Sequence, residues 1–234
     1  MSWANLRGVV RDPQQREVKM RKRIGYSTLV VLATMSGVAG AQIGRRGPQS
    51  ADPGYWVGLS YGYLDGTTIN DSRTDATWRF GYSSQLRATL EKTIQRGVSV
   101  GLSAGFTTAP LDYDGSSSGV VCSLRCSAKA DITQWLATLR AGGSSGFHGA
   151  YNIEAGVTQF SHFRERSSGA ALPPSSASSD FTFGFGGGFG YNFSPISEAY
   201  VGEQFQFVLH PQGDNASQSA PRLLTFRVGF RMGF

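Results

Sequence analysis

The chain has 234 residues, enough for one large or two small domains, and a formal net charge of +6. Its apolar residues amount to 40%, and no stretch reaches the roughly 18 unbroken apolar residues of a membrane-spanning helix. Five of the six net positive charges precede Gln42, in a segment that we expect to be removed, so a nucleic-acid partner is not expected. Glycine (31) and phenylalanine (15) are abundant, which favours an all-β protein.

The segment 20–41 has the pattern of a secretory signal peptide. It begins with three consecutive bases, continues with the mostly apolar stretch 24–38, and ends with the small residues Ala39 and Ala41. The apolar stretch is too short and too rich in Gly, Ser and Thr for a membrane anchor. We therefore expect export and cleavage directly before Gln42.

These features divide the chain into four segments. Residues 1–19 precede a well-formed signal peptide and are interpreted as a non-native extension, with Met20 as the natural start. Residues 20–41 are the signal peptide, and residues 42–53 form a polar periplasmic lead-in. Residues 54–234 form the folded domain.

Within that domain, apolar residues alternate with small or polar ones at period two, which predicts β-strands with two different faces. The predicted strands are 55–63, 76–91, 98–106, 133–140, 151–158, 181–193, 199–209 and 224–234. The connections near residues 95, 144 and 194 are tight, whereas those at 65–75, 109–130, 165–179 and 211–220 are long. Short turns at one rim and long loops at the other are typical of outer-membrane barrels. The predicted fold is an all-β, eight-stranded antiparallel up-and-down transmembrane β-barrel.

The two faces of these strands predict lipid outside and a narrow lumen inside. The apolar face carries aromatic residues near strand ends, as in the girdles at the interfaces of a bilayer. The expected girdle residues are Tyr55, Tyr61, Tyr63, Trp78, Phe106, Tyr191 and Phe193. The opposite face is mainly Gly, Ser and Thr with occasional charges. A soluble sandwich, which also alternates, is the alternative fold.

The last predicted strand resembles the C-terminal strand by which the barrel-assembly machinery recognises its clients. Phe230, Met232 and Phe234 form its apolar end. The mature chain, about 54–234, resembles the OmpA/OmpX-like eight-stranded outer-membrane β-barrel family. This resemblance implies a place in the outer membrane, among its lipid and lipopolysaccharide, after assembly by that machinery. It implies less about activity, because such families share a fold more than a function.

Charged residues on the predicted inward face are expected to form Arg–Glu pairs across the lumen, because an isolated charge there would be costly. The expected lumen cluster comprises Arg79, Arg87, Glu91, Arg140, Glu154, Glu198, Arg227 and Arg231. Together with inward glycines it predicts a blocked, hydrated polar core. A gated ion path through the same cluster is the alternative.

Cys122 and Cys126 fall in the second long loop. An oxidising compartment favours a small loop closed by a disulfide between them. A metal site is not expected, because further ligands are absent nearby in the sequence.

Ser161, His162 and Glu165 supply the residue types of the barrel enzymes that modify lipid A. Neighbouring residues on a strand point to opposite faces, however, so Ser161 and His162 are not expected to form a hydrogen bond. Enzyme function and a cofactor are therefore not expected.

The favoured function is structural and interactive: a barrel with a filled lumen that holds extracellular loops, and through them contacts an extracellular protein partner. Transport, as a narrow channel or a small-ligand barrel, is the alternative. A lipid A-modifying enzyme is the third hypothesis.

Overall fold

The computed structural model describes residues 53–115, 125–211 and 220–234. These residues form the strands β1 (Tyr55–Leu64), β2 (Thr68–Asp71), β3 (Ala76–Phe80), β4 (Ser83–Gln95), β5 (Val98–Gly115), β6 (Cys126–Gly142), β7 (Gly146–Glu165), β8 (Ser178–Ser194), β9 (Ser197–Leu209) and β10 (Arg222–Gly233).

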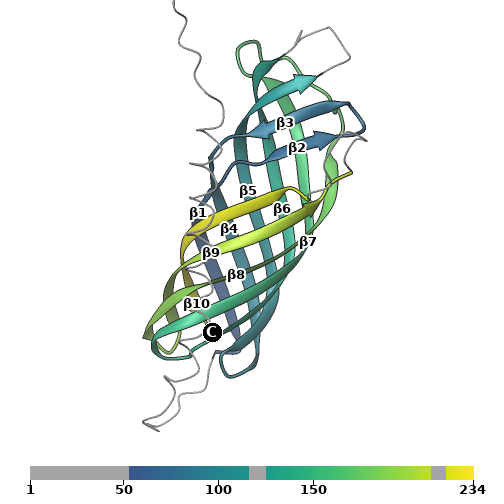
Figure 1. Ribbon diagram of the computed structural model, residues 1–234. Coiled ribbons are helices and arrows are strands. Elements are labelled where there is room, and N and C mark those ends of the chain that lie inside the picture. Colours follow the sequence, from purple (N-terminus) through teal and green to yellow (C-terminus); the bar gives the residue numbers. More distant parts are fainter. Residues whose placement is uncertain (1–52, 116–124, 212–219) are drawn as a thin grey trace, which may run out of the picture. The chain divides into compact units, whose positions relative to one another are not determined.

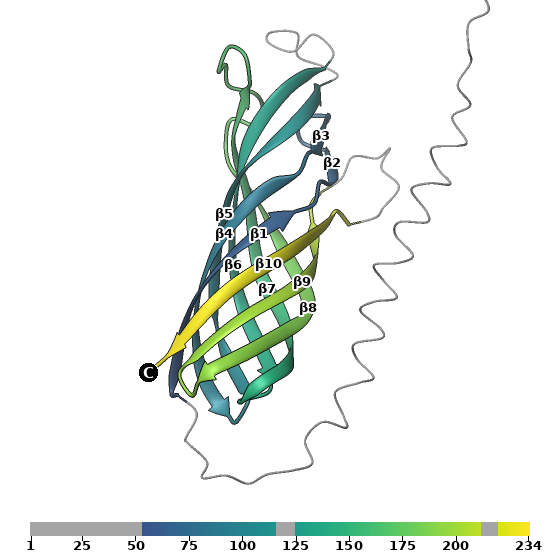
Figure 2. The same ribbon diagram turned by 90° about the vertical axis from the view of Figure 1, so that its left-hand side faces the viewer.

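Eight of these strands close into an antiparallel barrel (Figures 1 and 2). The sheet runs in the order β4-β1-β10-β9-β8-β7-β6, and β5 pairs with both β4 and β6 to complete the circle. Because the barrel is closed, each of its eight strands pairs with a neighbour on both sides. A sheet in hydrocarbon requires such closure, since no water is present to bond a free edge. The predicted eight-stranded up-and-down barrel is therefore confirmed.

The hairpin of β2 and β3 is an addition to the predicted topology. β3 pairs with the loop-end part of β5, opposite residues 111–115, and β2 pairs with β3 (Figure 1). The single strand predicted over residues 76–91 was wrong, because the chain breaks at Gly81 and Tyr82. Phe80 and Ser83 both point inward although they are three residues apart, so the alternation reverses phase at the break.

This reversal corrects two predictions that depended on a continuous strand. Trp78 was expected in the aromatic girdle, but its side chain points inward and is 0% exposed. Arg79 was expected in the lumen, but it lies on the outer face and pairs with Asp114 at 3.5 Å, with 40% of its side chain exposed.

The outer face of the barrel carries a continuous apolar surface, as a lipid-facing wall requires. Its exposed aromatic residues gather near both rims. Those near the short turns are Tyr55, Phe147, Tyr191, Phe193 and Phe234, and those near the long loops include Tyr63, Tyr82, Phe106, Trp135 and Phe181.

Strands β5, β6 and β7 are longer than a bilayer needs. They contain 18, 17 and 20 residues, whereas about 9–11 residues of a tilted strand cross the hydrocarbon. Their extra length lies at the long-loop end, where the β2–β3 hairpin joins the sheet (Figure 2). The barrel thus continues into a sheet that rises beyond the apolar wall.

The two ends of the barrel sequence are joined at the short-turn rim. The backbone N–H groups of Tyr55 and Phe234 donate to each other's carbonyls at 3.1 and 2.9 Å. Their rings also stack, with centroids 5.8 Å apart. Phe234 therefore completes the seam between the first and last barrel strands.

Deleting Phe234 should lower the yield of folded barrel several-fold, because the seam loses its last pair of hydrogen bonds and the apolar end of β10. We expect unfolded chain to accumulate in the periplasm. Heat-modifiable migration on gels, compared with Phe234→Tyr as the matched control, measures this; equal folded yields of the deletion and the control would contradict it.

Candidate functional site

The interior of the barrel contains three levels of side chains between the short turns and the long loops, and strand β10 contributes to all three. On β10 the inward residues are Arg231, Arg227, Thr225 and Leu223, and the last is 1% exposed. The character of the lumen thus changes from charged, through a network of charged and uncharged polar groups, to apolar.

The level nearest the short turns is an ion-pair cluster centred on the buried Glu198. Arg140 pairs with one carboxylate oxygen of Glu198, and Arg231 pairs with the other at 2.5 Å. Arg231 also reaches Glu91 at 3.1 Å, and Glu91 accepts a hydrogen bond from Ser99 at 2.5 Å. Two carboxylates therefore neutralise two guanidinium groups across the lumen.

Aromatic rings and glycines hold this cluster in place. Arg231 lies 4.2 Å from the ring centroid of Trp56, and Arg140 lies 5.1 Å from that of Tyr200. A Cβ added at Gly190 would come within 2.5 Å of the carboxylate of Glu198. The glycine on this wall is therefore what allows a long side chain to lie flat against it.

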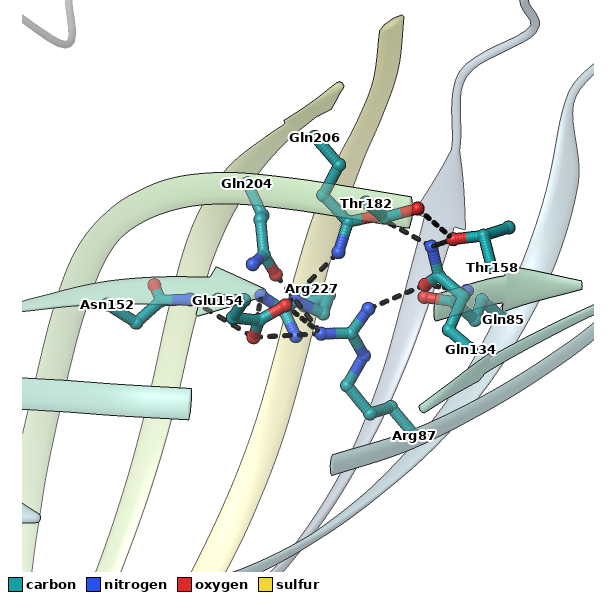
Figure 3. A network of polar contacts seen from close by, with 10 residues as sticks. All are labelled: Gln85, Arg87, Gln134, Asn152, Glu154, Thr158, Thr182, Gln204, Gln206 and Arg227. Carbon is teal, nitrogen blue, oxygen red and sulfur yellow. Dashed lines mark hydrogen bonds and ion pairs between the residues drawn. The ribbon is translucent and has the colours of Figure 1, made fainter. Parts of the chain in front are cut away.

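The middle level is a network around Arg87 and Glu154 (Figure 3). Arg87 Nη1 contacts the two carboxylate oxygens of Glu154 at 2.6 and 2.9 Å, and the two side chains are 1% and 4% exposed. Arg227 approaches the same carboxylate at 3.8 Å, and Arg87 Nη2 donates to Gln134 Oε1 at 2.7 Å. One glutamate thus serves two arginines in an almost dry environment.

Glutamine side chains complete this network and were not singled out from the sequence. Gln206 donates to Glu154 at 3.1 Å, and Gln134 donates to Gln206 at 2.8 Å. Gln204 accepts from Arg87 at 3.2 Å, and Gln85 donates to Gln134 at 2.9 Å. Their inward positions within alternating strands were the signal that could have found them.

Two small spaces lie beside the charged levels, among the described residues. One cavity of about 50 Å³ is bordered by Arg140, Glu154, Tyr200 and Arg227, and another of about 20 Å³ lies beside Trp56 and Arg231. Such volumes hold one or a few water molecules. The short-turn half of the lumen, which we call the lower lumen, can therefore contain water without forming a continuous channel.

The level at the long-loop end is apolar. Its buried residues come from the barrel wall, from the β2–β3 hairpin and from the β7–β8 connection, and we call them the apolar seal. The apolar seal consists of Leu64, Ile69, Ala76, Trp78, Phe80, Ala109, Leu111, Tyr113, Ala128, Ala130, Ile132, Phe160, Phe163, Leu172, Val208 and Leu223. Trp78 lies at its centre, with its ring 4.5 Å from that of Phe163. The expectation of a polar lumen throughout was wrong for this end.

A buried histidine between two carboxylates fastens the apolar seal. His210 contacts Asp180 at 2.7 Å through Nδ1 and Asp71 at 3.2 Å through Nε2. Burial alone would raise the pKa of Asp71, but hydrogen bonds from Thr74 and Arg73 hold that pKa below its ordinary value. Since Asp71 ends β2, this contact ties the hairpin to the barrel wall.

Of the eight residues of the expected lumen cluster, the structure places some in the interior and one on the outer face. Seven lie in the interior with ion-pair partners: Arg87, Glu91, Arg140, Glu154, Glu198, Arg227 and Arg231. Arg79 does not, and the interior holds four arginines against three glutamates in place of the five predicted arginines.

The expectation that Ser161 and His162 could not meet was wrong. Ser161 Oγ lies 3.2 Å from His162 Nδ1, and His162 has a φ of +53° at a β-bulge. The bulge breaks the alternation on which the expectation rested. Asp131 also contacts His162 through Nδ1, at 3.1 Å.

The predicted cleavage site at Ala39, Ala41 and Gln42 lies outside the described residues, as does Cys122. Cys126 begins β6. Within the described part of the chain, no group of three His, Cys, Asp or Glu residues could hold a metal ion. No helix among the described residues is long and apolar enough to cross a membrane.

A disulfide between Cys122 and Cys126 remains our prediction for exported protein, because three intervening residues permit a tight loop. Thiol labelling of unfolded, non-reduced protein should detect no free thiol, and labelling after reduction should detect two. Two reactive thiols before reduction would contradict this prediction.

Comparison with known families agrees with this architecture. Residues 27–231 match the family described as the outer membrane protein beta-barrel domain. The chain belongs to this family. It is therefore an outer-membrane β-barrel protein of the Gram-negative type. In such barrels the long loops usually face the outside of the cell.

Solved structures of small outer-membrane barrels are similar to this fold. Neisserial surface protein A (NspA) is 11% identical, with 79% of this chain and 100% of that chain covered and a TM-score of 0.51. OprG from Pseudomonas aeruginosa is 12% identical, with 79% and 98% covered and a TM-score of 0.48. At such identities the likeness concerns the fold alone. No match is found among curated protein sequences.

Proposed function

We propose that this protein is a surface-interaction barrel that fills its lumen with its own side chains and holds a sheet outside the membrane. The observation that carries this proposal is the apolar seal at the long-loop end of the lumen. Its central residues Trp78, Ile132 and Phe160 are each 0% exposed. A dry apolar layer opposes the passage of ions and polar solutes.

The raised sheet supports the interactive part of the proposal. Strands β3, β5, β6 and β7 pair beyond the apolar wall, and the hairpin is fastened there through His210. A rigid support of this kind positions exposed loops at little entropic cost. An extracellular protein is the partner class that such loops would contact.

Transport through a narrow channel is the second candidate, and the charged lower lumen with its cavities favours it. For conduction the apolar seal would have to open, which would expose aromatic residues to water. An enzyme is disfavoured by geometry: Ser161 and Asp131 both address Nδ1 of His162, whereas an acyl-transfer relay places the nucleophile and the acid on different ring nitrogens.

The biogenesis that we propose rests on the pattern of the sequence. Residues 20–41 would direct export, and residues 42–53 would lead into the barrel 54–234. The barrel-assembly machinery then reads the apolar end of β10, at Phe230, Met232 and Phe234.

The test uses cells that lack the protein, complemented either with the natural chain or with a variant in which residues 116–121 are replaced by a Gly-Ser turn. Attachment to immobilised extracellular proteins and uptake of small solutes are measured in these two strains and in the uncomplemented deletion strain. We expect attachment to need the natural loop and solute uptake to be the same in all strains. Uptake that falls on deletion, with attachment unchanged, would reject the proposal in favour of transport.

A further inference from the structure

The outer faces of β5, β6 and β7 change from apolar to polar at one height. Phe106 and Trp135 end the apolar wall there, with ring centroids 5.9 Å apart in an edge-to-face contact. The next outward residues toward the loops are polar, among them Thr108, Asp131 and Gln159. Aromatic residues at such a boundary mark the level of the lipid headgroups, here in the outer leaflet.

An open hollow of about 660 Å³ lies at this boundary. Its lining includes Phe106, Thr108, Asp131, Ser161, His162 and Ser175. The hollow therefore has aromatic surface on the membrane side and hydroxyl, imidazole and carboxylate groups on the loop side.

The β-bulge explains why so many polar groups face this hollow. Ser161 and His162 lie between Phe160 and Phe163, which both point inward, so two consecutive residues are turned outward. His162 contacts Asp131 at 3.1 Å, and Thr108 donates to Asp131 at 2.6 Å. Ser161 and Asp131 both approach His162 at Nδ1, and no described residue contacts its Nε2, which can therefore meet a ligand.

Two cations lie on the same strands as the lining residues Asp131 and His162, each two residues farther toward the long loops. Lys129 on β6 is the cross-strand partner of Arg164 on β7, and both are exposed. Neither has an ion-pair partner among the described residues, whereas the nearby outward arginines Arg79 and Arg125 pair with Asp114 and Asp112. Like charges directly opposite each other destabilise a sheet unless an anion lies between them.

We propose that this hollow binds the phosphorylated sugar headgroup of a lipid of the outer leaflet, which is the chemistry of lipopolysaccharide. Lys129 and Arg164 would hold the phosphate through charge-assisted hydrogen bonds. Asp131 and Ser161 would contact sugar hydroxyls, and an acyl chain would lie along Trp135. The site is on the outside of the barrel and does not depend on whether the lumen is closed.

The test measures binding to the full-length folded barrel in detergent micelles by native mass spectrometry. The probes are purified lipopolysaccharide, the same lipopolysaccharide after enzymatic removal of its phosphates, and inorganic phosphate. The variants are Lys129→Ala with Arg164→Ala, and, as the matched control, Arg79→Ala with Arg125→Ala. All four positions are solvent-accessible, and heat-modifiable migration checks that each variant is folded.

We expect the Lys129/Arg164 variant to bind lipopolysaccharide on the order of tenfold more weakly than the natural protein, since it loses two charge-assisted contacts. Removal of the phosphates should weaken binding to the natural protein similarly, and the control variant should bind as the natural protein does. Inorganic phosphate alone should not bind at millimolar concentration. Unchanged binding by the Lys129/Arg164 variant, or binding of inorganic phosphate as tight as that of lipopolysaccharide, would overturn the proposal of a lipid site.

Discussion

Replacing Glu154 with alanine should destabilise the barrel by about 3–5 kcal/mol, because Arg87 and Arg227 would then lose the carboxylate that they share in a nearly dry lumen. Removing one partner of a buried ion pair costs more than the pair contributes, since the remaining charge stays desolvated. Equilibrium unfolding in urea, in lipid vesicles or micelles, measures the free energy of unfolding directly.

Two further variants separate the charge from the volume of Glu154. Glu154→Gln keeps the hydrogen-bonding shape and removes only the charge. The free energy of unfolding should therefore fall by nearly as much as in Glu154→Ala. The paired replacement Arg87→Met with Glu154→Met should recover a substantial part of the stability, because it leaves fewer uncompensated charges. If the free energy of unfolding fell by less than about 1 kcal/mol in Glu154→Ala, water would reach the Arg87–Glu154 pair freely, because solvent-exposed ion pairs contribute no more than that.

Replacing Trp78 with alanine should cost about 3–5 kcal/mol, the range for truncating a large buried aromatic side chain. Trp78 is 0% exposed and packs on Phe160, Phe163 and His210, with ring centroids 6.1, 4.5 and 5.1 Å away. The Trp78→Ala replacement removes the centre of the apolar seal and one of the side-chain contacts of β3 with the barrel wall.

Because β3 belongs to an added hairpin, part of this effect should appear as local opening. Limited proteolysis of residues 65–82 reports that opening, and urea unfolding reports the global effect. Arg79→Ala is the matched control, since the next residue on the same strand points outward and pairs only at 3.5 Å. Equal protease resistance of the two variants would contradict the role of Trp78.

The sequence was sufficient to predict the barrel wall, because lipid outside and a narrow lumen inside impose a period of two on each strand. The run 55–63 carries that period without interruption, and 181–193 carries it except at Gly187; the faces of both are as predicted. The family match and the closed sheet confirm both the fold and the membrane.

The prediction failed where the period changes phase. The break at Gly81 depends on a hydrogen bond from its N–H to the carbonyl of Pro110, a contact that no local pattern shows. Because of this break, Trp78 points inward and Arg79 points outward, opposite to the prediction. The bulge turned His162 outward beside Ser161, and their contact was therefore wrongly excluded.

The apolar seal was missed for a related reason. Ile132, Phe160, Val208 and Leu223 occupy inward positions near the loop ends of four different strands. On β9 and β10 the neighbouring inward residues are polar, and only the closed barrel brings the apolar residues of the four strands together. The contact of His210 with Asp71 joins residues 139 positions apart, and no spacing rule predicts it.

Single-channel recording of the full-length folded barrel in planar bilayers tests the closed lumen most directly. An open porin recorded under the same conditions shows that the bilayer detects channels. The apolar seal and the paired charges below it predict no stable conductance steps from the natural protein. Long-lived, reproducible steps from the natural protein would contradict the closed lumen and would favour transport as its function.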